Sequence, residues 1–536
     1  MSGFDAPPLL LPDLIDRQSR WLGDKTALVA GAERRSWRDF GAGVRRTASA
    51  LREAGVRPGD RIVVMMRNSL EMVEAMFGIL RAGAVVVPLN VAVSDAAAHA
   101  MIADCGAMGV IASADHAARL ASQPQPAVRL WICVAAPATE QGSGFRWVDY
   151  HRMRDAAALE PPGAGVGSES ICNIIYSSGT TGLPKGIVHS HRRRLDWARD
   201  LALALRYDSR AITLCPIGLY SNISWVGLLC TLVVGGTIVV EESFDVQRTF
   251  EVIARERITH SSMVPVQFQR LLESPCLATA NLSSLRSLMC CGSPLPLALK
   301  QRALTDFGCD FIELYGLTEG IITTLSPEDA RLRPSSVGLP LPGTDLRLID
   351  ESGREVPTGE AGEIVSRGHI AMTGYYNRPD ADAEATWIDE QGRRWLRSGD
   401  IGRVDEAGFL YLVDRRKDMI ISGGQNIYPA DIEAVLLTNP IVSEVAVIGV
   451  PSERWGETPL ALVVPASRSV SAAAQVDAAT LVADAGSADG LRDWVNARLG
   501  RQQRVSAVRF VESLPRNPNG KILKRELRKT YAAAHG

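Results

Sequence analysis

The sequence lacks an excess of charge of either sign. Its 536 residues include 58 basic and 60 acidic side chains, which give a formal net charge of −2 at pH 7. A nearly neutral chain has no electrostatic field that would favour nucleic acid or an anionic membrane surface as its partner. This balance argues against both as the default partner, and a small-molecule substrate is the better expectation.

Cysteine pairs with metal-ligand spacing are also lacking. The nine cysteines are an odd number spread over a long chain, without CxxC or Cys/His ligand patterns. This usage indicates reduced thiols and argues against a disulfide framework or a zinc site. Residues 1–12 lack the basic stretch and apolar core of a secretory signal. We therefore expect a cytoplasmic protein.

One long uncharged stretch, Gly218 to Val240, has to be weighed as a membrane span because its length could cross a bilayer. Asn222 and several serines interrupt it, and a Gly-Gly break precedes the β-branched run Thr237–Val240. This pattern favours a buried helix, a turn and a strand over a membrane span.

Hydrophobic residues make up 46% of the chain, which is typical of a globular protein with several core-sized units. Short β-branched runs alternate with helical patterns, beginning with a strand over 61–65, a helix over 69–81 and a strand over 85–88. The same alternation continues through the ranges 245–255, 259–263, 288–290, 295–307 and 311–315. It predicts parallel sheet covered by helices.

The pattern changes after about Pro334 to short strands and glycine turns, over 345–350, 362–366 and 408–413, which indicates a small β unit. A charged cluster over 414–418 then precedes an α+β pattern whose first helix opens at Pro429, a residue suited to a first helical turn. We predict an α/β protein with an N-terminal domain over 1–413, a hinge over 414–417 and a small mobile C-terminal α+β domain over 418–536. Residues 469–490 resemble a low-complexity surface insertion or a weak helix, and no function is assigned to them.

The strongest local motif is an unbroken run of small polar residues and glycines directly after an apolar strand over 171–176. In order, it reads Ser177, Ser178, Gly179, Thr180, Thr181, Gly182, Leu183, Pro184, Lys185 and Gly186. Backbone N–H groups, small hydroxyls and one lysine can converge there on a single anion. The run therefore predicts a phosphate-binding loop. It is not a Walker A loop, because Lys185 lies between a proline and a glycine.

Together with motifs that follow in order between about residues 27 and 525, this loop resembles the adenylate-forming superfamily of acyl-CoA synthetases, adenylation domains of peptide synthetases and firefly luciferases. The matching stretches are Gly292-Ser293-Pro294 near the purine, Tyr315-Gly316-Leu317-Thr318-Glu319 for adenine and metal, Ser398-Gly399-Asp400 for the ribose, and Pro515 to Ile522 as the final signature. Ser398 and Asn517 each replace the family's usual threonine.

The resemblance implies a role for each matched position. Tyr315 stacks on the adenine, Thr318 contacts the α-phosphate, Glu319 binds Mg²⁺, Asp400 accepts hydrogen bonds from the ribose, Arg415 reaches ribose and phosphate, Lys417 is the hinge residue and Lys521 is the mobile catalytic lysine. A substrate carboxylate must approach another anion at the α-phosphate, and a long-stemmed ammonium offsets the charge that gathers there. No nucleophilic side chain is required, so His189 and His191 have no covalent role.

The segment after the hinge, including Ser422, Gly423 and Gly424, resembles the acyl-CoA ligase version, in which glycines let the pantetheine arm pass. The expected enzyme uses ATP, Mg²⁺ and coenzyme A to form an acyl-adenylate with release of pyrophosphate, and then an acyl-CoA thioester. The alternative is a stand-alone adenylation enzyme that loads a carrier protein. An amino-acid substrate would need an acid for its ammonium group, and the segment Ala211 to Val240 contains no Asp or Glu.

By the same resemblance, the acyl pocket is drawn from Tyr220, Asn222, Trp225, Val264, Cys291, Gly316 and Ile321. The stretches that supply these residues contain no Lys or Arg, so a second carboxylate on the substrate would lack a partner there. We expect a neutral medium-length, branched, alicyclic or aromatic monocarboxylic acid. The sequence does not determine the oligomeric state, and a homodimer is a common one for such enzymes.

Overall fold

The protein is described by a computed structural model. It covers residues 9–120, 122–123, 125–135, 147–159, 163, 165–177, 184–415, 418–422, 425–452, 455–466, 487–500, 503–516 and 521–532. The chain forms two compact units, which are Met1–Leu346 with Ser366–Leu396, and Arg347–Val365 with Arg397–Gly536. The hinge at 414–417 and the domain boundaries stay predictions.

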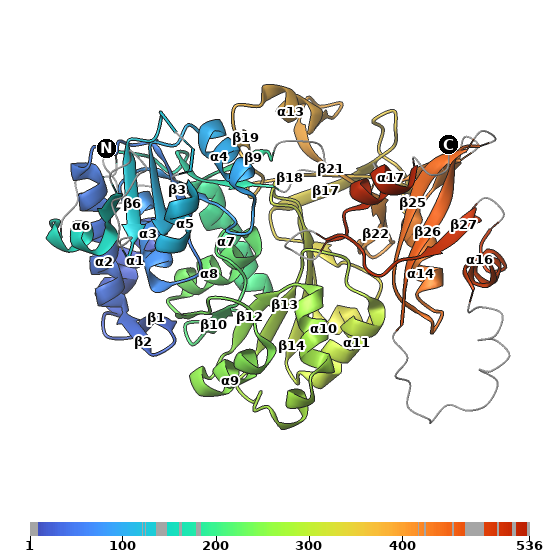
Figure 1. Cartoon of the computed structure of the whole chain (residues 1–536), viewed down its shortest axis with the longest axis horizontal. Helices are drawn as coiled ribbons and strands as arrows, with labels where there is room; N and C mark the ends of the chain where they lie inside the picture. The colour runs from blue at the N-terminus through green and yellow to red at the C-terminus, as the bar shows by residue number, and fades with distance from the viewer. Residues whose placement is uncertain are drawn as a thin grey trace. The chain divides into compact units, whose positions relative to one another are not determined.

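Two largely parallel sheets form the first unit (Figure 1). Within the described residues, the first sheet has the order β16 (Leu339–Pro340), β15 (Ile322–Leu325), β14 (Asp310–Gly316), β13 (Ser287–Cys290), β12 (His260–Met263), β10 (Ile212–Cys215), β11 (Thr237–Val240), β1 (Thr26–Ala30) and β2 (Glu33–Ser36). The second has the order β19 (Gly374–Tyr375), β9 (Gly186–Ser190), β8 (Ile171–Tyr176), β4 (Val85–Pro88), β3 (Arg61–Met65), β5 (Gly109–Ser113), β6 (Leu130–Val134) and β7 (Trp147–Asp149). Antiparallel strands occur only at the edges of these described sheets.

Helices cover both faces of these sheets, as the alternating pattern predicts. They are α1 (Leu11–Trp21), α2 (Trp37–Glu53), α3 (Leu70–Arg81), α4 (Asp95–Asp104), α5 (Ala114–Leu120), α6 (Tyr150–Ala156), α7 (His191–Ala204), α8 (Asn222–Val234), α9 (Val246–Glu256), α10 (Pro265–Glu273), α11 (Leu297–Asp306), α12 (Pro327–Leu332) and α13 (Pro379–Glu384), with a 3-10 turn over Pro275–Thr279. Serines cap several of them; the Ser69 hydroxyl, for example, accepts from the Met72 N–H. Strands such as β4 and β11 are buried along their whole length, which is expected for parallel sheet covered on both faces.

The largest hydrophobic core joins residues of both sheets to α2, α3, α7 and α8. Trp37, Phe40 and Phe77 are fully buried in this core. The Phe40 ring contacts the Trp37 ring on one hand and the Phe77 ring on the other. Each such side chain contributes roughly 1.5–3 kcal/mol relative to an exposed position. Helices α7 and α8, green in Figure 1, pack against each other within this core, α7 beside β9 and α8 beside β10 and β12.

The uncharged stretch Gly218 to Val240 folds as α8, a turn and β11. Gly235 ends the helix in a left-handed conformation, with φ of +69°. The prediction of a buried helix, turn and strand is confirmed. Within the described ranges, no helix is long and apolar enough to cross a membrane.

A third sheet contains β17 (Thr344–Ile349), β18 (Ala361–Gly368), β21 (Arg394–Val404), β20 (Thr386–Ile388) and β22 (Leu410–Arg415). Its strands β17, β18 and β22 overlap the strands predicted over 345–350, 362–366 and 408–413, whereas β21, with 11 residues, is longer than the short strands that we expected. The fourth sheet contains β24 (Gln425–Ile427), β23 (Ile420–Ser422), β26 (Gly456–Pro465), β25 (Val442–Ser452) and β27 (Ala507–Phe510), with α14 (Pro429–Leu436), α16 (Ala488–Asn496) and α17 (Lys524–Ala532). The helix predicted to open at Pro429 is α14. In the expected insertion over 469–490, residues 469–486 lie outside the described residues and 488–490 begin α16.

Candidate active site

Several predicted site residues follow the carboxyl ends of neighbouring parallel strands. Val264 follows β12, Cys291 and Gly292 follow β13, and Tyr315 and Gly316 end β14. Ligands of open α/β sheets bind outside this edge. The topology therefore brings the predicted purine, adenine and acyl residues of this unit to one edge of one sheet.

The turn at Gly292 packs closely against the start of α8. Its φ is +98°, and a Cβ at this position would lie 2.9 Å from Ile223 Cδ1 and 3.2 Å from Val264 Cγ1. A side chain would be strained both by the backbone conformation and by these neighbours. Ser293 and Pro294 continue the same turn.

The two ends of the predicted phosphate loop meet at the β8–β9 hairpin. The Ser177 N–H donates to the Lys185 carbonyl at 3.1 Å. The loop therefore joins two antiparallel strands, rather than a strand and a helix as in a Walker A motif. The other predicted loop residues, Ser178, Gly179, Thr180, Thr181 and Gly182, lie outside the described residues.

Lys185 and Glu319 both contact Tyr375, a residue that the sequence argument missed. The Tyr375 hydroxyl donates to Glu319 Oε1 at 2.9 Å, and Lys185 Nζ lies 5.0 Å from the centre of the Tyr375 ring. Burial, together with the Glu319 carboxylate, raises the pKa of the Tyr375 hydroxyl, so it stays protonated and able to donate. Lys185 Nζ also lies 3.9 Å from Glu384 Oε2. The arrangement puts one cation and one oriented carboxylate together at the described end of the predicted phosphate loop.

The turn that carries Thr318 and Glu319 is held from several directions. The Leu317 N–H donates to the Ile321 carbonyl, and the Glu319 carbonyl accepts from the Met372 N–H at 2.6 Å. The Thr318 carbonyl lies 2.9 Å from Nε2 of the buried His189. Burial lowers the pKa of His189 well below its usual value, so the ring is neutral and donates through Nε2.

Neither Cys291 nor His191 is an activated nucleophile. All nine cysteines are free, and each lies within the described residues. Burial raises the pKa of the Cys291 thiol to about 12 and lowers that of His191 to about 4. A buried protonated thiol is inert as a nucleophile, which supports a mechanism without a covalent enzyme intermediate.

The predicted acyl residues differ widely in exposure. Trp225 is fully buried, and its indole N–H donates to the Leu219 carbonyl at 2.9 Å, so it supports the wall from the core. Tyr220 is half-buried, and Asn222 is partly exposed at the first position of α8. Cys291 and Ile321 are buried, and Gly316 is exposed. The sequence argument missed Arg194 of α7, whose Nη1 donates to Asn222 Oδ1 at 2.8 Å.

In the second unit, two predicted ribose contacts are cross-strand partners. Asp400 on β21 pairs with Arg415 on β22. Asp400 is buried, and its N–H donates to the Ser398 hydroxyl, which donates in turn to the Ile364 carbonyl at 2.7 Å. The serine that replaces the family's threonine thus supports the backbone of the ribose motif.

Lys521 lies at the end of a loop closed by the pairing of Arg516 with Ile522 and by the bond from the Leu523 N–H to the Pro515 carbonyl. Ser422 ends β23 and pairs with Gln425. Three predicted positions, Lys417, Gly423 and Gly424, lie outside the described residues.

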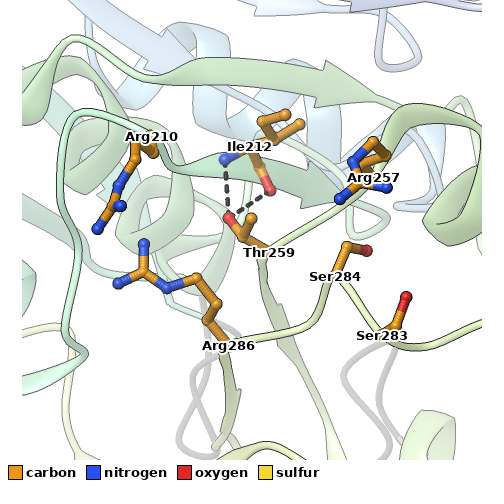
Figure 2. A pocket seen from close by; sticks show the side chains of 7 residues that line it. All are labelled: Arg210, Ile212, Arg257, Thr259, Ser283, Ser284 and Arg286. Carbon is orange, nitrogen blue, oxygen red and sulfur yellow. Dashed lines mark hydrogen bonds between the residues drawn. The ribbon is translucent and has the colours of Figure 1, made fainter.

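A pocket of about 400 Å³ lies at the opposite edge of the first sheet, where β10, β12 and β13 begin (Figure 2). Arg210, Arg257 and Arg286 contribute to its lining. Two of these arginines, Arg210 and Arg286, share Asp208 Oδ2, each at 2.8 Å. Since the predicted site residues follow the carboxyl ends of the strands, this pocket is not part of the candidate active site.

The AMP-binding enzyme family matches residues 15–376, and the AMP-binding enzyme C-terminal domain matches residues 431–521. The chain therefore belongs to the AMP-binding enzyme family. A feruloyl-CoA synthase of an Amycolatopsis species is 37% identical, covering 96% of this chain and 98% of that protein. A long-chain-fatty-acid–CoA ligase of Mycobacterium tuberculosis is 33% identical, covering 93% and 94%. These matches confirm the predicted enzyme class, an AMP-forming acyl-CoA synthetase.

The structure of ATP-bound MatB from Rhodopseudomonas palustris is similar to this chain with a TM-score of 0.86 and 27% identity, covering 98% of this chain and 100% of that one. The predicted α/β fold class, with a large parallel-sheet unit and a smaller second unit, is confirmed.

Proposed function

We propose that this enzyme converts a neutral medium-length, branched, alicyclic or aromatic monocarboxylic acid into its acyl-adenylate, and then into its CoA thioester. The observation that carries the proposal is the contact of Tyr375 with both Glu319 and Lys185, next to the Thr318 turn. It supports the assignment because a carboxylate for a metal ion and a cation for phosphate lie together at the end of the predicted ATP loop. Burial of the wall around Trp225 and Cys291 supports an uncharged acyl tail.

In the first half-reaction, the carboxylate of the acid displaces pyrophosphate from the α-phosphate of ATP. The phosphate loop, Lys185 and Thr318 position the triphosphate, and Lys521 offsets the charge on the reacting groups. Glu319 suits Mg²⁺, because this hard cation is usually bound through one or two carboxylates and substrate phosphates. Within the described residues, no group of three or more His, Cys, Asp or Glu side chains could hold a metal by itself. The ion, when bound, neutralises charge on the phosphates.

Asp400 and Arg415 hold the ribose of the adenylate, and Tyr315 stacks on its base. In the second half-reaction, the thiol of CoA attacks the acyl carbon and AMP leaves. Ser422, Gly423 and Gly424 line the approach of the pantetheine arm. Rotation of the C-terminal domain about Lys417 switches the enzyme from adenylation to thioester formation. We also propose that the enzyme is cytoplasmic and acts as a homodimer.

The experiment is pyrophosphate release from a panel of aromatic, alicyclic, branched and straight-chain acids, each with and without CoA, with the thioester product measured. We expect CoA-dependent thioester from at least one of these classes. Transfer to a carrier protein without any CoA-dependent turnover would instead support the adenylation enzyme that loads a carrier.

A further inference from the structure

Arg194 is a buried cation whose hydrogen bonds go to amide oxygens. Arg194 lies on α7 and is 1% exposed. Nε donates to Asn173 Oδ1 at 2.9 Å, and Nη1 donates to Asn222 Oδ1 at 2.8 Å. Within the described part of the chain, no carboxylate forms an ion pair with it, and Nη2 is buried without a hydrogen-bond partner. The guanidinium therefore depends on these two oxygens.

Such a cation is costly to bury, so its few contacts have to be kept. The rings of Trp197 and Trp225 lie 4.9 Å and 5.2 Å from its central carbon, within the range of cation–π attraction. Burial lowers the pKa of Arg194 to about 10, which still leaves it charged at neutral pH.

The charge fixes the orientation of the Asn222 side chain. A guanidinium has only donors, so the Asn222 atom that faces Arg194 must be the oxygen. A rotated amide would set two donors against each other and leave the buried cation with one acceptor fewer. The Asn222 Nδ2 group is consequently turned away from Arg194. Within the described residues, Nδ2 has no partner, and Asn222 is partly exposed.

This oriented donor lies at the predicted acyl wall. Asn222 is the first residue of α8, and the next residue, Ile223, packs against the Gly292 turn and beside Val264. These neighbours follow the carboxyl ends of β12 and β13, the edge at which we place the substrate.

We propose that Asn222 selects acids whose tail carries a neutral oxygen acceptor, a hydroxyl, ether or carbonyl group, which accepts a hydrogen bond from Asn222 Nδ2. Arg194 is the positioning residue that holds the amide in this orientation. The inference rests on the proposed function and deepens it, because it names a polar feature of the acid. The buried guanidinium itself does not meet the substrate, so the tail remains uncharged.

The test compares matched pairs of acids on aromatic, alicyclic and straight-chain skeletons, each with and without one hydroxyl or methoxy group. The readout is the ratio of kcat/KM for thioester formation within each pair. This ratio does not change with the fraction of correctly folded enzyme. A neutral hydrogen bond predicts a preference of roughly 3- to 10-fold for the oxygen-bearing acid in the best pair.

Asn222→Asp keeps the shape of the side chain and its bond to Arg194 but replaces the donor by an acceptor. We expect the ratio for the methoxy pairs to fall to one or below in this variant, because a methoxy oxygen only accepts; a hydroxyl would instead donate to the new carboxylate, so the methoxy pairs decide this comparison. Arg194→Leu should lower the ratio partly, since the amide can then rotate, and Arg194→Lys should restore some of it. Tyr220→Phe removes a neighbouring hydroxyl of the predicted wall and tests the competing donor. Tyr411→Phe, which lies outside the predicted site residues, is the control and should keep the wild-type ratio.

Equal ratios for the methoxy pairs in wild type and Asn222→Asp would overturn the inference while leaving the ligase intact. Loss of the preference in Tyr220→Phe but not in Asn222→Asp would also overturn it, because the acceptor would then contact Tyr220. Absence of thioester with every acid would refute the proposed function and this inference with it.

Discussion

Tyr375 gives the most direct test of the site, since it contacts both predicted phosphate-handling groups. Tyr375→Phe removes the hydroxyl that donates to Glu319 Oε1 at 2.9 Å but keeps the ring beside Lys185. A hydrogen bond to a charged group is worth about 1.5–3 kcal/mol. Tyr375 is only partly buried, so solvent weakens the bond and the lower end of this range applies. That value corresponds to about a tenfold loss in rate or affinity.

The assay is pyrophosphate release at fixed ATP and acid as the Mg²⁺ concentration is varied. We expect the variant to need more Mg²⁺ and to lose about tenfold in kcat/KM for ATP, because the carboxylate is no longer held in one orientation. Thioester formation from supplied acyl-adenylate should be nearly unchanged.

The matched control is Tyr411→Phe, which removes a hydroxyl that donates to Asp405 Oδ2 at 3.0 Å, outside the predicted site residues. An unchanged Mg²⁺ dependence in Tyr375→Phe, or the same change in both variants, would refute the assignment of Glu319 to the metal.

Three further predictions concern catalysis, folding and pH. Lys521→Ala should lower the rate of adenylation by orders of magnitude, while thioester formation from supplied acyl-adenylate largely survives. Equal loss in both assays would contradict the proposal that Lys521 serves only the first half-reaction. Gly320→Ala should reduce the soluble yield or the thermal midpoint of unfolding, because φ is +115° and the added Cβ would lie 2.5 Å from Ala371 Cα; a midpoint equal to that of wild type would argue against this turn geometry. Burial lowers the pKa of His191 and of His260 from 6.5 to about 4. The unfolded chain therefore binds more protons between these values, and the free energy of unfolding falls as the pH drops, by about 1.5 kcal/mol per histidine from pH 6.5 to 5. Urea unfolding at both pH values should show a smaller fall in the free energy of unfolding for His260→Gln than for wild type. Equal falls in the two proteins would mean that His260 does not titrate in this way.

Much of the architecture could be predicted from local sequence, because periodicity and turn residues act over a few positions. The strands predicted over 61–65 and 85–88 are β3 and β4, and the helix predicted over 69–81 is α3. Boundaries differ by a residue or two where caps decide them: Ser69 is the N-cap rather than the first helical residue.

The site could be predicted only in part. The order of motifs along the chain predicts the ATP residues, since each motif is continuous in sequence. Tyr375 could not be found this way. It reaches Glu319 because the two-residue strand β19 pairs with β9, setting Tyr375 opposite Ile187. A strand of two residues is too short to produce a periodic hydrophobic pattern in the sequence.

The sequence by itself determined the family, the class of reaction and the parallel α/β fold, because these depend on contiguous motifs and on hydrophobic periodicity. Only the tertiary structure decided which side chains meet at the predicted acyl wall. The predicted wall carries no formal charge in its own segments, yet the packing of α7 against α8 sets the buried Arg194 against Asn222. Contacts between residues 28 positions apart in sequence are set by how the helices pack, and local patterns carry no information about them.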